Sequence, residues 1–306
     1  MNQRLALALR PTLYGPEEIL AFAKLTDESD HVSTIFFPDI WASLDSIELS
    51  AAVLTVTKRV KAGSGVLRPL EHDLNTLARR LGTVQYLSNN RFVLGVGTGK
   101  PVTNPSETIT RMLKMIDEIR NAIPTEFKGR TVSPPEVFVA ALRLGIAKRA
   151  IHNANGLILN FCSPEYASNL VKNLRLAIGS GVIDSRTLVC YIKIFFSKNV
   201  DMAKRLLIEE FANYDANPQY HDMFVHDGVA DDIRSASRSL SSKRSLEIPD
   251  SLYEISLANP SVEQLQKLVN KFRTAGINLP CVYPYFSPHD ETSFKTDVMK
   301  QILEIE

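Results

Sequence analysis

The sequence predicts an α/β fold: a (β/α)8 TIM barrel with a helical insertion between its seventh and eighth strands. Eight short apolar runs alternate with longer segments of helical period along the 306 residues. This alternation is typical of parallel βαβ units, and a closed barrel of eight units takes about 250 residues. The main alternative, an open dinucleotide-binding sheet, usually carries a glycine fingerprint after its first strand. The turn at residues 10–15 reads RPTLYG and lacks that fingerprint, which favours the barrel.

Four strand–helix pairs account for the first half of the chain. The strand runs are mostly apolar throughout, as expected for strands buried in a parallel sheet. In the segments that follow them, apolar residues recur at helical spacing. Asp45 or Ser46 is a plausible N-cap of the second helix, and Glu48 lies at capping-box distance from Asp45. The strands are expected at residues 4–9, 32–38, 60–67 and 91–96, and the helices at 16–29, 45–58, 73–87 and 106–123.

The second half repeats this rhythm with one long interruption. Ser163-Pro164 is a helix start signal, and Gly276 is a helix stop. The strands are expected at residues 136–141, 156–161, 188–196 and 279–286, and the helices at 144–154, 164–178, 261–275 and 293–303. Residues 199–259 contain helical pieces but no clear strand, so we expect them to form an insertion over the barrel mouth. No shift in composition marks a linker, and we predict a single domain over residues 1–306.

Composition excludes several classes of protein. The chain has 35 Lys+Arg and 34 Asp+Glu, a formal net charge of +1, and 44% hydrophobic residues. These values exclude a disordered, collagen-like or disulfide-scaffold protein and argue against a nucleic-acid or membrane-surface partner. Cys162, Cys190 and Cys281 are far apart and are predicted to be buried thiols in a reducing compartment. No signal-peptide pattern or membrane-spanning run is evident, so we expect a cytoplasmic protein. Its expected partner is a small-molecule substrate.

In such a barrel the active site lies at the carboxyl ends of the strands. Asp39 closes the second strand and is therefore a candidate for catalysis or ligand orientation, or else the N-cap of a short turn. Trp41, the single tryptophan, is expected either to stack on a ring or to pack under the insertion. Tyr283 and Tyr285, at alternate positions of the eighth strand, are expected to pack in the core, with hydrogen bonding in the mouth as the alternative.

Glycines mark the ends of the third and fourth strands. Those around Ser64, Gly65 and Val66 by themselves favour a plain bend at the barrel rim, and the alternative is a bulge or a close approach of the backbone to a ligand. Gly95, Gly97 and Gly99 alternate along the end of the fourth strand. Their spacing leaves one face of the strand without side chains, and we expect room there for a flat group.

The fifth strand runs directly into a helix, a junction suited to anions. Free N–H groups and the helix dipole attract negative charge at a helix N-terminus. Arg143 adds a guanidinium that suits phosphate, although an exposed arginine in a first helical turn is an equal alternative. The candidate residues at this junction are Ala141, Leu142, Arg143, Leu144 and Gly145.

Two kinds of chemistry are not expected. The six histidines are scattered and none falls in HxxxH or HExxH spacing, so we predict no metal site. There is no GxSxG motif and no Ser/His pair at strand ends, which argues against hydrolysis by acyl transfer.

Two segments resemble the bacterial-luciferase-like superfamily. They are residues 63–99 (GSGVLRPLEHDLNTLARRLGTVQYLSNNRFVLGVGTG) and 137–166 (VFVAALRLGIAKRAIHNANGLILNFCSPEY). That superfamily contains FMN-dependent monooxygenases and oxidoreductases that use the deazaflavin coenzyme F420, such as methylenetetrahydromethanopterin reductase. The resemblance implies a non-prolyl cis peptide at Gly65–Val66 or Ser64–Gly65, against which the cofactor ring leans. It also implies that the cofactor tail runs past Thr98 toward residues 141–145.

The chain departs from several relatives at functional positions. Ile40 stands where several deazaflavin-dependent relatives have a histidine, and Lys100 stands where some sugar-phosphate dehydrogenases have an acid. Arg143-Leu144 replaces a common Gly-Pro turn. The catalytic groups of those relatives therefore do not transfer to this chain. Lys100 and Arg143 would instead suit an acidic cofactor tail.

We therefore expect an oxidoreductase that transfers hydride between reduced coenzyme F420 and a small organic or pterin-like substrate, with Asp39 orienting the substrate or moving a proton. An FMN-dependent monooxygenase and a non-catalytic flavin-binding barrel are the alternatives. By the same resemblance, a homodimer is expected.

Overall fold

The computed structural model describes residues 4–41, 43–99, 104–241 and 246–306. In this part of the chain, eight parallel strands close into a barrel, which confirms the predicted fold class. Each strand pairs with the next in chain order, and β9 pairs with both β8 and β11, while β11 returns to β1. The barrel strands are β1 (Leu5–Ala8), β2 (Val32–Phe37), β3 (Lys61–Leu67), β4 (Phe92–Val96), β7 (Glu136–Ala140), β8 (Gly156–Asn160), β9 (Thr187–Phe196) and β11 (Leu279–Phe286).

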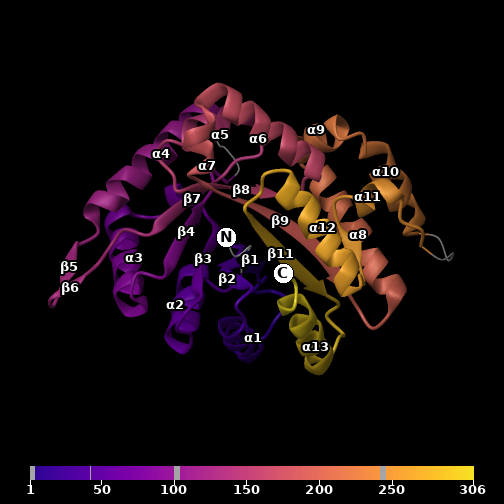
Figure 1. Ribbon diagram of the computed structural model, residues 1–306, viewed down its shortest axis with the longest axis horizontal. Helices are drawn as coiled ribbons and strands as arrows, with labels where there is room; N and C mark the ends of the chain where they lie inside the picture. The colour runs from indigo at the N-terminus through magenta and orange to yellow at the C-terminus, as the bar shows by residue number, and fades with distance from the viewer. Residues whose placement is uncertain (1–3, 42, 100–103, 242–245) are drawn as a thin grey trace.

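Helices surround these strands on the outside of the barrel (Figure 1). They are α1 (Pro16–Glu28), α2 (Ser46–Val56), α3 (Leu74–Ser88), α4 (Pro105–Ala122), α5 (Leu144–Ala150), α6 (Pro164–Ile178), α12 (Val262–Thr274) and α13 (Thr292–Leu303). Of the two predicted N-caps of α2, the structure has Asp45, whose side chain accepts hydrogen bonds from the N–H groups of Ile47 and Glu48. Helix α5 ends four residues earlier than expected, where residues 151–154 turn toward β8.

The insertion between β9 and β11 is mainly helical. It contains α8 (Val200–Asp215), α9 (Pro218–His226), α10 (Ala230–Ser239) and α11 (Asp250–Tyr253), which gather on the β9 side of the barrel (Figure 1). A short strand that we did not predict, β10 (Leu257–Ala258), pairs in parallel with Ile194 and Phe195 of β9. Two residues are too few to give a periodic signal in the sequence.

Three other short elements were also absent from the prediction. They are the 3-10 turn η1 (Pro69–Glu71), the helix α7 (Ser180–Asp184) and the hairpin of β5 (Glu126–Phe127) with β6 (Arg130–Thr131). The hairpin projects away from the barrel (Figure 1). Its two-residue turn places Lys128 and Gly129 at positive φ, as tight hairpin turns require.

Candidate active site

The third strand carries a bulge at its carboxyl end. The pairing of β3 with β4 shifts between Ser64 and Leu67, and the peptide bond between Gly65 and Val66 is cis, as the resemblance implied. The Ser64 hydroxyl donates to the Gly95 carbonyl (2.9 Å), and the Tyr191 hydroxyl donates to the Gly65 carbonyl (3.3 Å). The neighbouring strand β4 and the more distant strand β9 therefore both hold the backbone of the bulge.

The glycines of β4 do not leave the free space that the sequence suggested. A Cβ on Gly95 would lie 2.3 Å from the Ser64 carbonyl oxygen, and one on Gly97 would lie 2.7 Å from Cγ2 of Val66. Because the bulge of β3 already occupies this space, the expectation of room for a flat group beside these glycines was wrong. Gly95 and Gly97 instead allow β3 to lie close against β4.

Asp39 lies at the barrel mouth and pairs with an arginine that the sequence analysis missed. Arg68 Nη2 lies 3.3 Å from Asp39 Oδ2, and Arg68 Nε lies 3.0 Å from a carboxylate oxygen of Glu71. Burial raises the pKa of Asp39, and the charge of Arg68 offsets only part of this effect. In the described chain the Asp39 carboxylate accepts no hydrogen bond from a backbone N–H, so it does not cap a turn.

The lone tryptophan is exposed. Trp41 has 81% of its surface accessible, so the expectation that it packs under the insertion was wrong. It lies two residues after Asp39, in the segment that follows β2.

The proposed tail-binding residues follow β4 and β7, which are neighbours in the barrel. Ala141 is buried, and the Leu142 carbonyl accepts a hydrogen bond from the Tyr166 hydroxyl (2.7 Å). The space beside Gly145 is not filled by other residues, since a Cβ added to this glycine would meet no atom within 4 Å. Thr98, at the end of β4, is partly exposed. Lys100 lies outside the described residues.

Arg143 is already engaged by a carboxylate. Its Nη2 lies 2.8 Å from Asp222 of α9, and about half of the arginine side chain and two thirds of the aspartate side chain are exposed. An ion pair that is this exposed contributes roughly 0–1 kcal/mol, so an incoming anion can displace it. Helix α5, which follows Arg143, has seven residues and no side-chain cap at its start.

The other side of the mouth holds a buried charged cluster that sequence reasoning did not find. Lys193 of β9 has no exposed surface, and its Nζ contacts the Glu210 carboxylate of α8 and the Tyr285 hydroxyl of β11 (3.1 Å). The Tyr285 hydroxyl donates in turn to Glu210 Oε1 (2.7 Å). Arg10, after β1, donates from Nη1 to the Tyr285 hydroxyl (3.2 Å). The signal that could have revealed this cluster is a lysine inside the apolar run LVCYIKIFF.

These contacts set the charge of Glu210. Its burial alone would raise its pKa, but the Lys193 ammonium, hydrogen bonds from Lys193 and Tyr285, and the charge of Arg10 hold the pKa below its ordinary value. Glu210 is therefore a carboxylate at neutral pH.

Aromatic residues of the insertion extend this cluster over the mouth. Lys193 Nζ lies 3.8 Å from the centroid of the Tyr214 ring, a cation–π contact. Asn160, at the end of β8, donates to the hydroxyls of Tyr214 (3.2 Å) and Tyr220 (2.8 Å). Its Oδ1 is buried and has no hydrogen-bond partner in the described chain. Helices α8 and α9 thus cover one side of the mouth.

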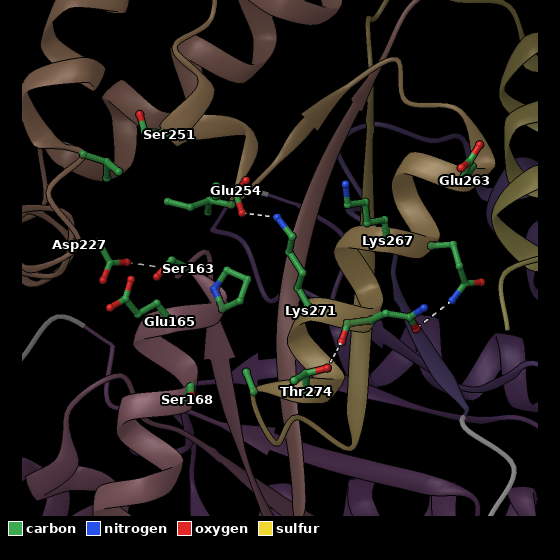
Figure 2. Close-up of a pocket in the computed structure, with 16 residues that line it drawn as sticks. Ser163, Glu165, Ser168, Asp227, Ser251, Glu254, Glu263, Lys267, Lys271 and Thr274 are labelled. Carbon is green, nitrogen blue, oxygen red and sulfur yellow. Dashed lines mark hydrogen bonds and ion pairs between the residues drawn. The ribbon is translucent and has the colours of Figure 1, made fainter.

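A groove of about 900 Å³ lies outside the barrel, between α6, α11 and α12 (Figure 2). Asp227 accepts a hydrogen bond from the Ser163 N–H (3.3 Å) at one side of the groove, and Lys271 pairs with Glu254 at the other. None of the site residues predicted from the sequence lines this groove, so it is separate from the mouth.

Other features of the described residues bear on the class of protein. The three cysteines are free and buried, as predicted. No group of three or more His, Cys, Asp or Glu in this part of the chain is arranged to hold a metal ion. Within the same residues, no helix combines the length and the apolar character needed to cross a membrane.

The chain is similar to a known protein family and to curated proteins. Residues 9–278 match the family described as luciferase-like monooxygenase. A curated relative, the F420-dependent glucose-6-phosphate dehydrogenase of Amycolatopsis mediterranei (strain U-32), is 28% identical over 182 residues, which cover 47% of this chain and 54% of that protein. The matched region thus spans about half the length of that relative.

Solved structures with both kinds of cofactor share the fold. An F420-dependent secondary alcohol dehydrogenase in complex with an F420–acetone adduct has a TM-score of 0.73 at 14% identity, covering 100% of this chain and 98% of that one. The oxygenating constituent of 3,6-diketocamphane monooxygenase from Pseudomonas putida, in complex with FMN, has a TM-score of 0.65 at 13% identity, with coverage of 100% and 98%. At these identities the likeness shows the fold alone.

Proposed function

Because the chain belongs to the luciferase-like monooxygenase family, we propose that it is an oxidoreductase that binds coenzyme F420 at the barrel mouth. It would transfer hydride between this cofactor and a small organic or pterin-like substrate. The observation that carries the proposal is the arrangement of the candidate residues. The bulge at Ser64–Val66 lies near the carboxyl end of β3, and Asp39, Thr98 and residues 141–145 follow the neighbouring strands β2, β4 and β7. They therefore line one continuous side of the mouth.

The residues that follow β4 and β7 suit the anionic tail of such a cofactor. The space around Gly145 is open, and Arg143 is exposed enough to exchange Asp222 for a phosphate or carboxylate. Thr98 adds a partly exposed hydroxyl between the bulge and Arg143. The bound deazaflavin would supply the hydride chemistry, and the protein would supply binding, orientation and water exclusion.

Asp39 is the residue that we assign to proton handling or substrate orientation. Its raised pKa brings the carboxyl closer to neutral pH, where a general acid or base works best. Arg68 contacts one carboxylate oxygen and fixes the orientation of the side chain. Helices α8 and α9, which cover the other side of the mouth, would limit the access of water to the reaction.

An FMN-dependent monooxygenase is the second candidate function. The FMN complex of the diketocamphane monooxygenase shares the fold over the whole of this chain. The two functions differ at the ring, because a deazaflavin has a carbon in place of a flavin nitrogen and reacts poorly with oxygen.

Titration with both cofactors tests the proposal. Purified protein is titrated with F420 and, separately, with FMN, while the fluorescence of each cofactor is followed. Micromolar binding of F420 alone supports the proposed function, and binding of FMN alone supports the monooxygenase. If neither cofactor binds to a folded protein, both enzymatic functions are wrong.

A further inference from the structure

Two cationic side chains at the barrel mouth share a single carboxylate among the described residues. Lys193 Nζ contacts Glu210, and Arg10 Nη1 lies 4.0 Å from Glu210 Oε1. Tyr285, which joins these groups, stays neutral because burial raises its pKa well above the ordinary value. Two positive charges and one negative charge leave the cluster with a net charge of +1. A net charge in a partly buried site is unfavourable unless a further anion balances it.

The unbalanced charge belongs to Arg10 rather than to Lys193. The ammonium of Lys193 contacts the Glu210 carboxylate, the Tyr285 hydroxyl and the Tyr214 ring. In the described chain the Arg10 side chain makes one hydrogen bond, to the Tyr285 hydroxyl, and its guanidinium carbon lies 5.5 Å from the centroid of the Tyr285 ring, but its buried Nε has no hydrogen-bond partner. Its distance to Glu210 is too long for a hydrogen bond.

Two other partly buried arginines in this chain behave differently. Arg59 donates to the backbone carbonyls of Thr26, Asp27, Ser29 and Val32. Arg91 likewise donates to the carbonyls of Leu54, Thr57, Val60 and Ser88. By contrast, the Arg10 guanidinium keeps most of its donors available, and 30% of its side chain is exposed at the mouth.

We propose that Arg10 binds an oxyanion of the substrate, either a carboxylate or a phosphate. A guanidinium presents parallel N–H donors that match both groups. The inference rests on the proposed function, because it names the substrate class of the same mouth. Arg10 follows β1, which is paired with β2 and β11. A substrate anchored there would lie between the Lys193 cluster and Asp39.

The anionic tail of the cofactor is a second source of the same chemistry. The residues that we assign to the tail follow β4 and β7, and β2 and β3 separate these strands from β1. The substrate is therefore the better match for Arg10, and the experiment must separate the two sources.

The first arm of the test measures anion binding without cofactor. Inorganic phosphate and acetate are titrated into the protein by calorimetry, with chloride holding the ionic strength constant. The wild type should bind at least one of them saturably, and the preferred anion identifies phosphate or carboxylate. Arg10→Gln should weaken this binding about tenfold or more. The anion affinity of Arg10→Lys should lie between those of the wild type and Arg10→Gln, because lysine keeps the positive charge but lacks the parallel N–H donors of the guanidinium.

A matched control uses an arginine far from the mouth. Arg175 pairs with Asp184 (2.9 Å) near the end of α6 that points away from the mouth, so Arg175→Gln should bind the anion like the wild type. Thermal melting monitors the fold of each variant, and if Arg10→Gln does not fold, Arg10→Lys carries the comparison. The proposal is overturned if the wild type binds neither anion, or if the Arg10 variants bind as tightly as the wild type.

The second arm repeats the cofactor titrations with Arg10→Gln. The dissociation constant of the cofactor should not change. A tenfold loss of cofactor affinity would assign the oxyanion to the cofactor tail and overturn the substrate assignment. If no cofactor binds but the anion binds in an Arg10-dependent way, the proposed function fails while the oxyanion site stands.

Discussion

At the scale of the residue, one buried lysine explains how the insertion is held over the mouth. Lys193 of β9 contacts Glu210 and the ring of Tyr214, both from α8. A fully buried ammonium is tolerated only when it is paired and hydrogen-bonded, because its desolvation costs several kcal/mol. The contact between Lys193 and Glu210 therefore ties α8 to β9, in addition to the buried apolar residues Leu207, Ile208 and Phe211 of the helix.

Replacing Glu210 should destabilise the protein strongly. Glu210→Gln leaves Lys193 buried without a counter-ion, and we expect the free energy of unfolding to fall by about 3–5 kcal/mol. Urea unfolding at pH 7 measures the change. Lys193→Met combined with Glu210→Gln removes both charges and should recover most of the loss. Equal stability of Glu210→Gln and the wild type would contradict the assigned pairing.

The difference in unfolding free energy between the wild type and Glu210→Gln should depend on pH in a definite direction. The folded-state pKa of Glu210 lies below its ordinary value, so its contribution to stability is complete above the glutamate pKa in the unfolded chain, about 4.3. The contribution is lost as the pH falls below that value and through the folded-state pKa. The stability gap between the wild type and Glu210→Gln should therefore narrow on acidification.

The role of Asp39 can be separated from cofactor binding. Asp39→Asn should lower turnover by about 10²-fold or more, as expected for the loss of a general acid or base. The affinity for the cofactor should stay unchanged, because the amide keeps the shape of the side chain. If the Asp39 carboxylate is the base, the activity of the wild type should fall as the pH drops through the raised pKa of Asp39. The pH–activity profile of Asp39→Asn should lack this fall on the acid side.

A surface carboxylate serves as the control for this experiment. Asp184 pairs with Arg175 far from the mouth, and Asp184→Asn should retain full turnover. An Asp39→Asn variant that is as active as the wild type would remove Asp39 from the mechanism.

At the scale of the element, the close contact between β3 and β4 shapes the mouth. The bulge of β3 fills the space that the glycines of β4 leave, and a hydrogen bond from Ser64 to the Gly95 carbonyl ties the two strands together. The sequence showed the glycines but not their neighbour, because strand pairing brings together residues that are about thirty positions apart.

A methyl group at Gly95 should disturb this contact. Gly95→Ala places a Cβ 2.3 Å from the Ser64 carbonyl oxygen, and overpacking of this kind costs about 1–3 kcal/mol. Gly181→Ala in α7 is the matched control, because its Cβ would meet no atom within 4 Å. It should be neutral or stabilising by up to about 1 kcal/mol. Thermal or urea unfolding compares the two variants, and equal stability would argue against the tight packing at Gly95.

At the scale of the whole molecule, the mouth has two different sides. One side, along β2, β3, β4 and β7, carries Asp39 and the proposed cofactor residues. The other side, along β8, β9, β11 and β1, is covered by α8 and α9 and contains the Lys193 cluster. Under the proposed function, the cofactor would bind along the first side, and a substrate held by Arg10 would extend from the second side toward Asp39.

The oligomeric state is a separate prediction at this scale. A chain of 34.1 kDa that forms the expected homodimer should elute with about twice that mass. Light scattering coupled to size-exclusion chromatography measures it at micromolar concentration, and a mass of one chain would contradict the expectation.

The sequence by itself determined the barrel, because eight mostly apolar strand runs alternate with longer segments in which apolar residues recur at helical spacing. It also pointed to Asp39 and the β3 bulge, since barrel strands end at predictable positions. The short elements β5, β6, η1, α7 and β10 were not predicted, because two to five residues give no periodic signal in the sequence. The tertiary structure alone decided that Arg10, Lys193, Glu210 and Tyr285 form one cluster. These residues are up to 275 positions apart, and only barrel closure, which pairs β11 with β1, brings their charges within reach of one another.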